Sequence, residues 1–104
     1  MPVEGVDTDG RPISVDPEGR TIYFLTSSCE PCRPVWAALS AGSAVVVTPD
    51  PSTESRRKVA ELASGGLTVV MSSEAWFHYA AGPAPWKVSV SGGAVLSEGP
   101  ADVV

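Results

Sequence analysis

Apolar residues fall into short continuous runs along this chain, separated by polar and turn-forming residues. Residues 21–26 are β-branched, aromatic or apolar almost throughout, as in a strand that is covered on both faces. Residues 44–48 and 67–71 have the same character. These three runs predict buried strands of a central sheet.

Between these runs the apolar residues recur at helical spacing. This spacing predicts a helix over residues 31–40. A second helix is expected to start from a cap at Ser52 or Thr53 and to run to about residue 63. A short third helix that carries Trp76 and Phe77 is predicted over residues 73–79, and Trp76 is expected in the core.

Hairpin signals occur near both ends of the chain. Two turn signals enclose an alternating segment at residues 12–15, which predicts a peripheral hairpin or edge strand. Residues 86–90 alternate between apolar and polar side chains, and Ser91-Gly92-Gly93 turns them back into residues 94–98. This pattern predicts a C-terminal β-hairpin with one face in water.

The order of these elements defines the expected fold class. Strands that alternate with helices favour right-handed crossovers and a parallel core, to which the final hairpin adds antiparallel strands. The prediction is an α/β fold with a mixed sheet and helices on both faces. A chain of 104 residues matches one domain, so residues 1–104 are expected to form a single unit.

Charge and hydropathy exclude several classes of function. Twelve acidic and seven basic residues give a net charge of -5, which is the wrong sign for binding to phosphate backbones, so no nucleic-acid partner is expected. The longest apolar runs fall far short of the roughly 20 residues that a membrane-spanning helix needs. The N-terminus lacks the features of a secretory signal. The chain is therefore expected to be cytosolic or a soluble piece of a longer protein.

The residues with the clearest chemical potential are Cys29-Glu30-Pro31-Cys32, at the junction between the first buried strand and the first helix. A cysteine at a helix N-terminus is expected to have a lowered thiol pKa, which makes Cys29 the candidate nucleophile. Cys32 lies one turn further on and can attack a mixed disulfide formed at Cys29. Arg33 adds positive charge near the sulfurs and Glu30 adds negative charge, so their combined effect on the thiol pKa stays open.

Two other interpretations compete with redox exchange for this cysteine pair. A structural zinc site needs four ligands, whereas this chain offers two thiols and His78, so no metal site is expected. A static disulfide is the second alternative, although closing so small a loop contributes little stability. His78 is interpreted as a surface or helix-end residue, because nothing pairs it with Cys29.

Residues 23–36, with this motif, resemble the strand, active-site motif and helix of the thioredoxin-like superfamily, and within it the TlpA-like thiol-disulfide oxidoreductases. Members of that family carry a cis-proline that faces the disulfide, and Pro85 matches its position. By this resemblance the backbone of Ala84 pairs with a bound substrate segment, and Trp86 is a candidate for lining the same groove. Pro31, between the two cysteines, is also expected to tune the redox pair.

The chain departs from the family pattern at several positions. Tyr23 stands where thioredoxin has a buried acid, and Ser28 replaces the aromatic residue that often precedes the first cysteine. Pro34 is awkward in a helix that begins at Cys29, which predicts a kink or a later helix start. Only residues 100–104 follow the hairpin, so the family's terminal helix is expected to be missing or truncated, with apolar sheet surface left exposed or covered by a partner.

The resemblance implies thiol-disulfide exchange with protein substrates, without a bound cofactor. It also implies a redox partner protein and an extracytoplasmic location, as a soluble domain of a membrane-anchored protein, with a cytoplasmic location as the alternative. The alternative function is a thioredoxin-fold binding module that carries a static disulfide. The direction of electron flow, the natural substrate and the oligomeric state do not follow from the sequence.

Overall fold

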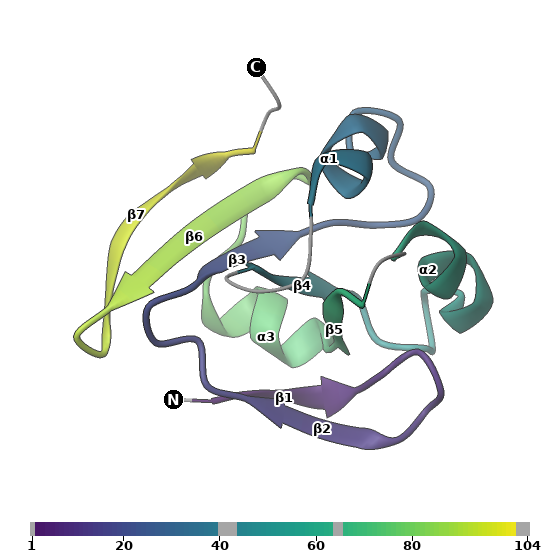
Figure 1. The fold of residues 1–104 in the computed structure, drawn as a ribbon, viewed down its shortest axis with the longest axis horizontal. Helices are drawn as coiled ribbons and strands as arrows, with labels where there is room; N and C mark the ends of the chain where they lie inside the picture. Colours follow the sequence, from purple (N-terminus) through teal and green to yellow (C-terminus); the bar gives the residue numbers. More distant parts are fainter. Residues whose placement is uncertain (1, 40–43, 64–65, 102–104) are drawn as a thin grey trace.

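A mixed β-sheet of seven strands forms the centre of this computed structural model, which describes residues 2–39, 44–63 and 66–101. The strands are β1 (Val3–Val6), β2 (Pro12–Val15), β3 (Thr21–Phe24), β4 (Ala44–Thr48), β5 (Thr68–Met71), β6 (Trp86–Ser91) and β7 (Ala94–Pro100). They lie in the order β2-β1-β5-β4-β3-β6-β7 (Figure 1). Strands β3, β4 and β5 are parallel, and the two terminal hairpins add antiparallel strands at either side. The predicted mixed sheet with a parallel core is confirmed.

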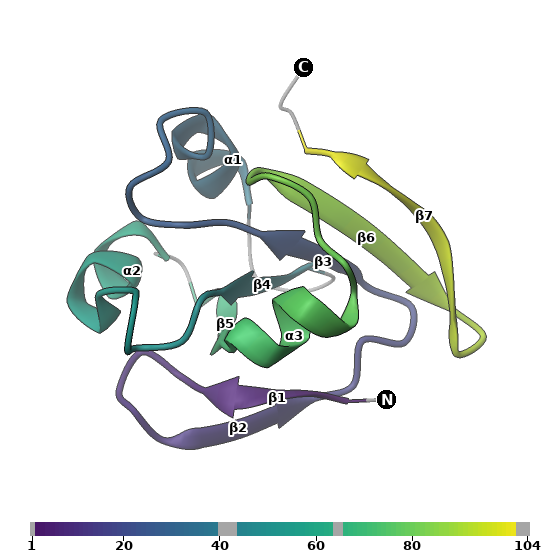
Figure 2. The ribbon, with the colours of Figure 1, turned by 180° about the vertical axis from the view of Figure 1, so that it is seen from behind.

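Helices cover the two faces of this sheet. The helices of the described residues are α1 (Arg33–Ala38), α2 (Arg56–Leu62) and α3 (Ser73–His78). Helices α1 and α2 pack on one face, and α3 packs on the other, where it lies in front of the sheet in Figure 2. This arrangement confirms the expected three layers.

Strand β4 shows why the parallel strands are so continuously apolar. Val45 and Val47 belong to the cluster beneath α3, whereas Val46 belongs to the cluster beneath α1 and α2. All three side chains are 0% exposed, so each position of this strand needs an apolar residue whichever face it points to. The α3-side cluster also contains Phe24, which meets the ring of Trp76 edge to face at 5.4 Å.

Helix α1 begins later than residue 31, the predicted start. Its first residue is Arg33, Cys32 is the N-cap, and Pro34 falls in the first turn. A proline in the first turn of a helix loses no intrahelical hydrogen bond, because that N–H group has no partner there. The later start therefore accommodates Pro34 without a kink. The helix ends at Ala38, and Ser40, the predicted last residue, lies outside the described residues.

The predicted cap of the second helix at Ser52 or Thr53 is wrong. Asp50 holds these residues in a turn, because its carboxylate accepts a hydrogen bond from the Ser52 N–H at 3.0 Å and its carbonyl accepts one from the Thr53 N–H at 3.1 Å. Helix α2 starts at Arg56 instead, and the Ser55 hydroxyl caps it by accepting from the Lys58 N–H at 3.2 Å.

Among the described residues no helix follows β7, as expected. The face of β6 that points away from α3 is polar. Thr21, Lys87 and Ser89 face outward on the α1 side, opposite the α3-side cluster, and the hydroxyls of Thr21 and Ser89 lie 3.3 Å apart. The exposed apolar surface expected for this sheet lies on the neighbouring strand β7, where Val95 is 45% and Leu96 69% exposed.

Candidate redox site

A disulfide joins Cys29 and Cys32 in the loop between β3 and α1, with 5.2 Å between the two Cα atoms. The loop folds as a tight turn in which the Cys32 N–H donates to the Cys29 carbonyl at 3.2 Å. The Cys32 carbonyl then accepts from the Trp36 N–H at 2.9 Å, which leads the turn directly into the helix. The two sulfurs thus lie at the carboxyl end of a central parallel strand, where sites of α/β proteins commonly form.

The two sulfurs of this disulfide differ in their exposure. Cys32 is 0% exposed and packs with Leu25 and with Val35 and Trp36 of α1. Cys29 is only half-buried, at the edge of the same cluster. An attacking thiolate has to reach a sulfur along the bond that it breaks, so access decides which sulfur reacts. Cys29 is therefore the more accessible sulfur of the pair, and Cys32 is shielded from solvent.

The loop before β6 completes the surroundings of Cys29. The peptide bond between Ala84 and Pro85 is cis, and the Sγ atom of Cys29 lies 3.7 Å from the carbonyl oxygen of Ala84. The Pro85 carbonyl accepts a hydrogen bond from the Ala101 N–H at 2.9 Å, which ties this loop to the end of β7. The structure therefore brings Cys29, Cys32, Ala84 and Pro85 together from distant parts of the chain.

The charged residues of the motif lie in water. Glu30 and Arg33 are both exposed, as is Pro31 between the cysteines. Charges in water interact weakly, at about 1 kcal/mol for a pair 4 Å apart. Helix α1 begins at Arg33 with Cys32 as its N-cap, which confirms the later start that Pro34 predicted. Cys29 lies three residues before this cap, and its sulfur is bonded to that of Cys32.

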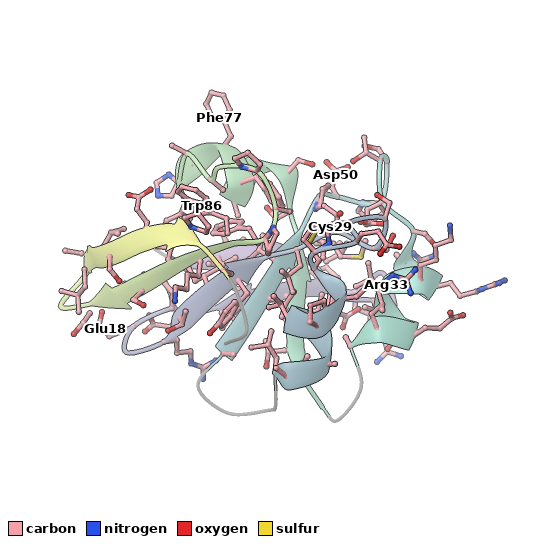
Figure 3. All side chains as sticks on the ribbon, turned by 90° about the horizontal axis from the view of Figure 1, so that it is seen from above. Glu18, Cys29, Arg33, Asp50, Phe77 and Trp86 are labelled. Atoms are coloured by element: carbon pink, nitrogen blue, oxygen red, sulfur yellow. A yellow bond between two sulfur atoms is a disulfide. The ribbon has the colours of Figure 1, made fainter. Side chains whose placement is uncertain are left out.

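The Trp86 ring is not among the groups that the structure brings to the sulfurs. It packs with the α3-side cluster, and a Cβ atom on Gly82 would lie 2.6 Å from two of its ring carbons. Its indole N–H is buried without a hydrogen-bond partner in the described part of the chain. In Figure 3, Trp86 and Cys29 are labelled at separate positions along the sheet. The close fit to Gly82 makes Trp86 a support of the loop that carries Ala84.

His78 lies far from any cysteine chemistry. It is exposed in the last turn of α3, and its ring meets the Tyr79 ring edge to face at 5.0 Å. Helix α3 covers the sheet face opposite α1, so His78 and the disulfide occupy different sides of the sheet. Within residues 2–39, 44–63 and 66–101, no three His, Cys, Asp or Glu side chains cluster in a way that could hold a metal ion.

Sequence reasoning missed Glu54, which contacts the loop that leads into Cys29. Its carboxylate accepts hydrogen bonds from both the N–H and the hydroxyl of Ser27, two residues before the cysteine. Glu54 lies 25 residues after Cys29 in a turn before α2, and no local pattern links the two segments. Only the folded structure brings them together.

Comparisons with known proteins identify the fold. The chain is similar to StoA from Bacillus subtilis, with a TM-score of 0.63 and 19% sequence identity over 95% of this chain and 87% of StoA. It is also similar to the thioredoxin domain of a thiol-disulfide oxidoreductase from Bacteroides vulgatus, with a TM-score of 0.66 and 16% identity over 94% and 83% of the two chains. No protein-family model matches the chain, and no curated protein sequence matches it.

The class of the fold follows from these likenesses. The chain has a thioredoxin-like fold, as the resemblance at residues 23–36 implied, with a disulfide between two cysteines at C-x-x-C spacing. In the described part of the chain, the helices are all too short or too polar to cross a bilayer.

Proposed function

We propose that this protein exchanges disulfides with protein substrates, with Cys29 as the nucleophile and Cys32 as the resolving residue. The observation that carries the proposal is the difference in exposure within one disulfide: Cys29 is half-buried, and Cys32 is completely buried. A disulfide that served only as a staple needs no exposed sulfur beside a loop such as Ala84–Pro85. The thioredoxin-like fold supports the same activity.

The proposed reaction begins with the reduced protein. The Cys29 thiolate attacks one sulfur of a substrate disulfide, forms a mixed disulfide and releases the other substrate sulfur as a thiolate. The Cys32 thiolate then attacks the Cys29 sulfur, which forms the Cys29–Cys32 bond and releases the second substrate sulfur. Two electrons pass from the protein to the substrate, and the released thiolates take up protons. The same steps in reverse oxidise a substrate dithiol, and neither direction needs a bound cofactor.

The surroundings of the disulfide have assigned parts in this proposal. The backbone of Ala84, beside Cys29, pairs with the extended substrate segment, and Pro85 shapes the docking surface there. Glu30, Pro31 and Arg33 tune the exchange from the exposed side of the turn. The proposed partners are a protein substrate and a second redox protein that resets the cysteine pair. The proposed setting, from the TlpA-like resemblance, is outside the cytoplasmic membrane in a membrane-anchored protein.

Two single substitutions test the proposal. Cys29→Ser removes the accessible sulfur and is expected to abolish reduction of a protein disulfide such as that of insulin. Cys32→Ser leaves Cys29 without its resolving partner and is expected to accumulate a mixed disulfide with the substrate, visible on a non-reducing gel. If the unsubstituted protein turns over no disulfide substrate, or if Cys29→Ser retains full activity, the proposed function is wrong. The alternative of a binding module with a static disulfide then remains.

A further inference from the structure

The segment that enters the redox turn is tied to the start of α2 through one carboxylate. Glu54 accepts a hydrogen bond from the Ser27 N–H at 2.9 Å and a second from the Ser27 hydroxyl. The same carboxylate accepts a third from the N–H of Ser55, the N-cap of α2, at 2.9 Å. Both oxygens of Glu54 are thus used to join two loops that are far apart in the sequence.

This contact completes the anchoring of the segment between β3 and Cys29. The Leu25 N–H donates to the Val47 carbonyl at 3.0 Å, and the Thr26 carbonyl accepts from the Trp36 indole N–H at 3.3 Å. Ser27 is the next residue, and Glu54 is its side-chain partner. Beyond Ser27, only Ser28 separates this anchor from Cys29. The position of Cys29 relative to the buried Cys32 therefore depends on where Ser27 is held.

We propose that Glu54 is a positioning residue of the redox site, which holds Ser27 so that the Cys29 sulfur stays within bonding reach of Cys32. The inference rests on the proposed exchange function and adds to it a residue that sets the balance between disulfide and dithiol. Holding two thiols together raises their effective concentration and so favours the disulfide.

Equilibrium with glutathione measures this balance directly. Two glutathione thiols reduce the protein: the Cys29–Cys32 bond breaks, glutathione disulfide forms, and both electrons with two protons pass to the two cysteines. In Glu54→Gln, a single amide oxygen replaces two acceptor oxygens, so at least one donor of Ser27 or Ser55 loses its partner. We expect this substitution to shift the equilibrium constant about fivefold toward the reduced protein, about 1 kcal/mol.

A second substitution tests whether Glu54 acts through Ser27. Ser27→Ala removes the hydroxyl but keeps the backbone N–H and the charge of Glu54, so a smaller shift in the same direction is expected, about twofold to threefold. The double variant is expected to show the same shift as Glu54→Gln, about fivefold and not the tenfold or more that independent effects would give, because the Ser27 hydroxyl has no carboxylate left to contact. Effects that multiply fully in the double variant would overturn the inference.

Glu61→Gln is the matched control. It removes a carboxylate from α2, the helix that follows Glu54, where the Glu61 side chain is two-thirds exposed and forms an ion pair with Arg57 at 3.5 Å. The equilibrium constant of this control with glutathione is expected to stay within twofold of that of the unsubstituted protein. Thermal unfolding of each variant checks that it is folded. If the equilibrium constant of Glu54→Gln is indistinguishable from that of Glu61→Gln, the role of Glu54 is overturned. The glutathione equilibrium gives this answer even if insulin reduction fails, so the two proposals can fall separately.

Discussion

The Sγ atom of Cys29 lies 3.7 Å from the carbonyl oxygen of Ala84, although 55 residues separate them in the chain. In the disulfide this sulfur carries no proton, so the two atoms are only in contact. Once Cys29 is reduced, its thiol can donate a weak hydrogen bond to this carbonyl.

Leu25 should contribute strongly to stability, because it is 0% exposed at the point where β3 ends and the redox loop begins. Leu25→Ala deletes most of a buried side chain and leaves a cavity, and it is expected to lower the free energy of unfolding by about 2 to 5 kcal/mol. Urea denaturation measures the loss. Leu96→Ala makes the same chemical change at a side chain that is 69% exposed, and it should cost less than about 0.5 kcal/mol. Equal losses at the two positions would contradict the assignment of the core.

Gly82 should resist substitution because of the Trp86 ring. A Cβ atom at this position would lie 2.6 Å from two ring carbons, so Gly82→Ala forces the indole or the Ala84–Pro85 loop to move. We expect a destabilisation of about 1 to 3 kcal/mol together with slower disulfide exchange. In the strand β7, Gly99 has open space around the same atom, and Gly99→Ala should affect neither quantity. If Gly82→Ala leaves both the Trp fluorescence and the exchange rate unchanged, the fit is looser than described.

Asp50 should make stability depend on pH in the acid range. Hydrogen bonds from the hydroxyl and N–H of Ser52 hold the pKa of this carboxyl below its ordinary value of 3.8. Because the pKa is lower in the folded than in the unfolded state, this contribution to stability is present above pH 3.8 and is lost as the pH falls through the folded-state pKa. In urea denaturation, the unsubstituted protein is expected to exceed Asp50→Asn in free energy of unfolding by less at about pH 2 than at about pH 7.

Asp9→Asn provides the comparison for this pH series. Asp9 is an exposed carboxylate, and none of the hydrogen bonds among the described residues ends on its side chain. Its substitution should change the slope of stability against pH less than Asp50→Asn does. If the two variants respond alike, the turn at Ser52 does not stabilise the carboxylate.

The strands were predictable because their patterns are local and redundant. Residues 44–48 were predicted with the bounds that β4 has, since burial on both faces demands an unbroken apolar run. The helix starts were not predictable to the same degree. The start of α2 depends on a turn held by Asp50, and that of α1 on the place of Pro34 in the first turn. Such choices depend on individual hydrogen bonds that periodicity does not report.

The candidate site, too, could be predicted only in part from the sequence. The spacing of Cys29 and Cys32 marked the redox pair, and the family resemblance brought Pro85 to it. The contact between Glu54 and Ser27 has no signal in the sequence, because it joins two loops through a single side chain. The Trp86 ring was expected near the groove from its place after Pro85, but the alternation of β6 turns it toward the α3-side cluster. Contacts of this kind become visible only once the strands are paired.

The difference in access between the two sulfurs is the central claim, and alkylation of the reduced protein tests it most directly. Brief treatment with iodoacetamide at about pH 8, followed by mass spectrometry of the peptides, gives the rate at each cysteine. Cys29 is expected to react at least about tenfold faster than Cys32, because reactivity follows the exposure of the thiolate. Equal rates at the two cysteines, or faster modification of Cys32, would contradict the assignment of Cys29 as the nucleophile.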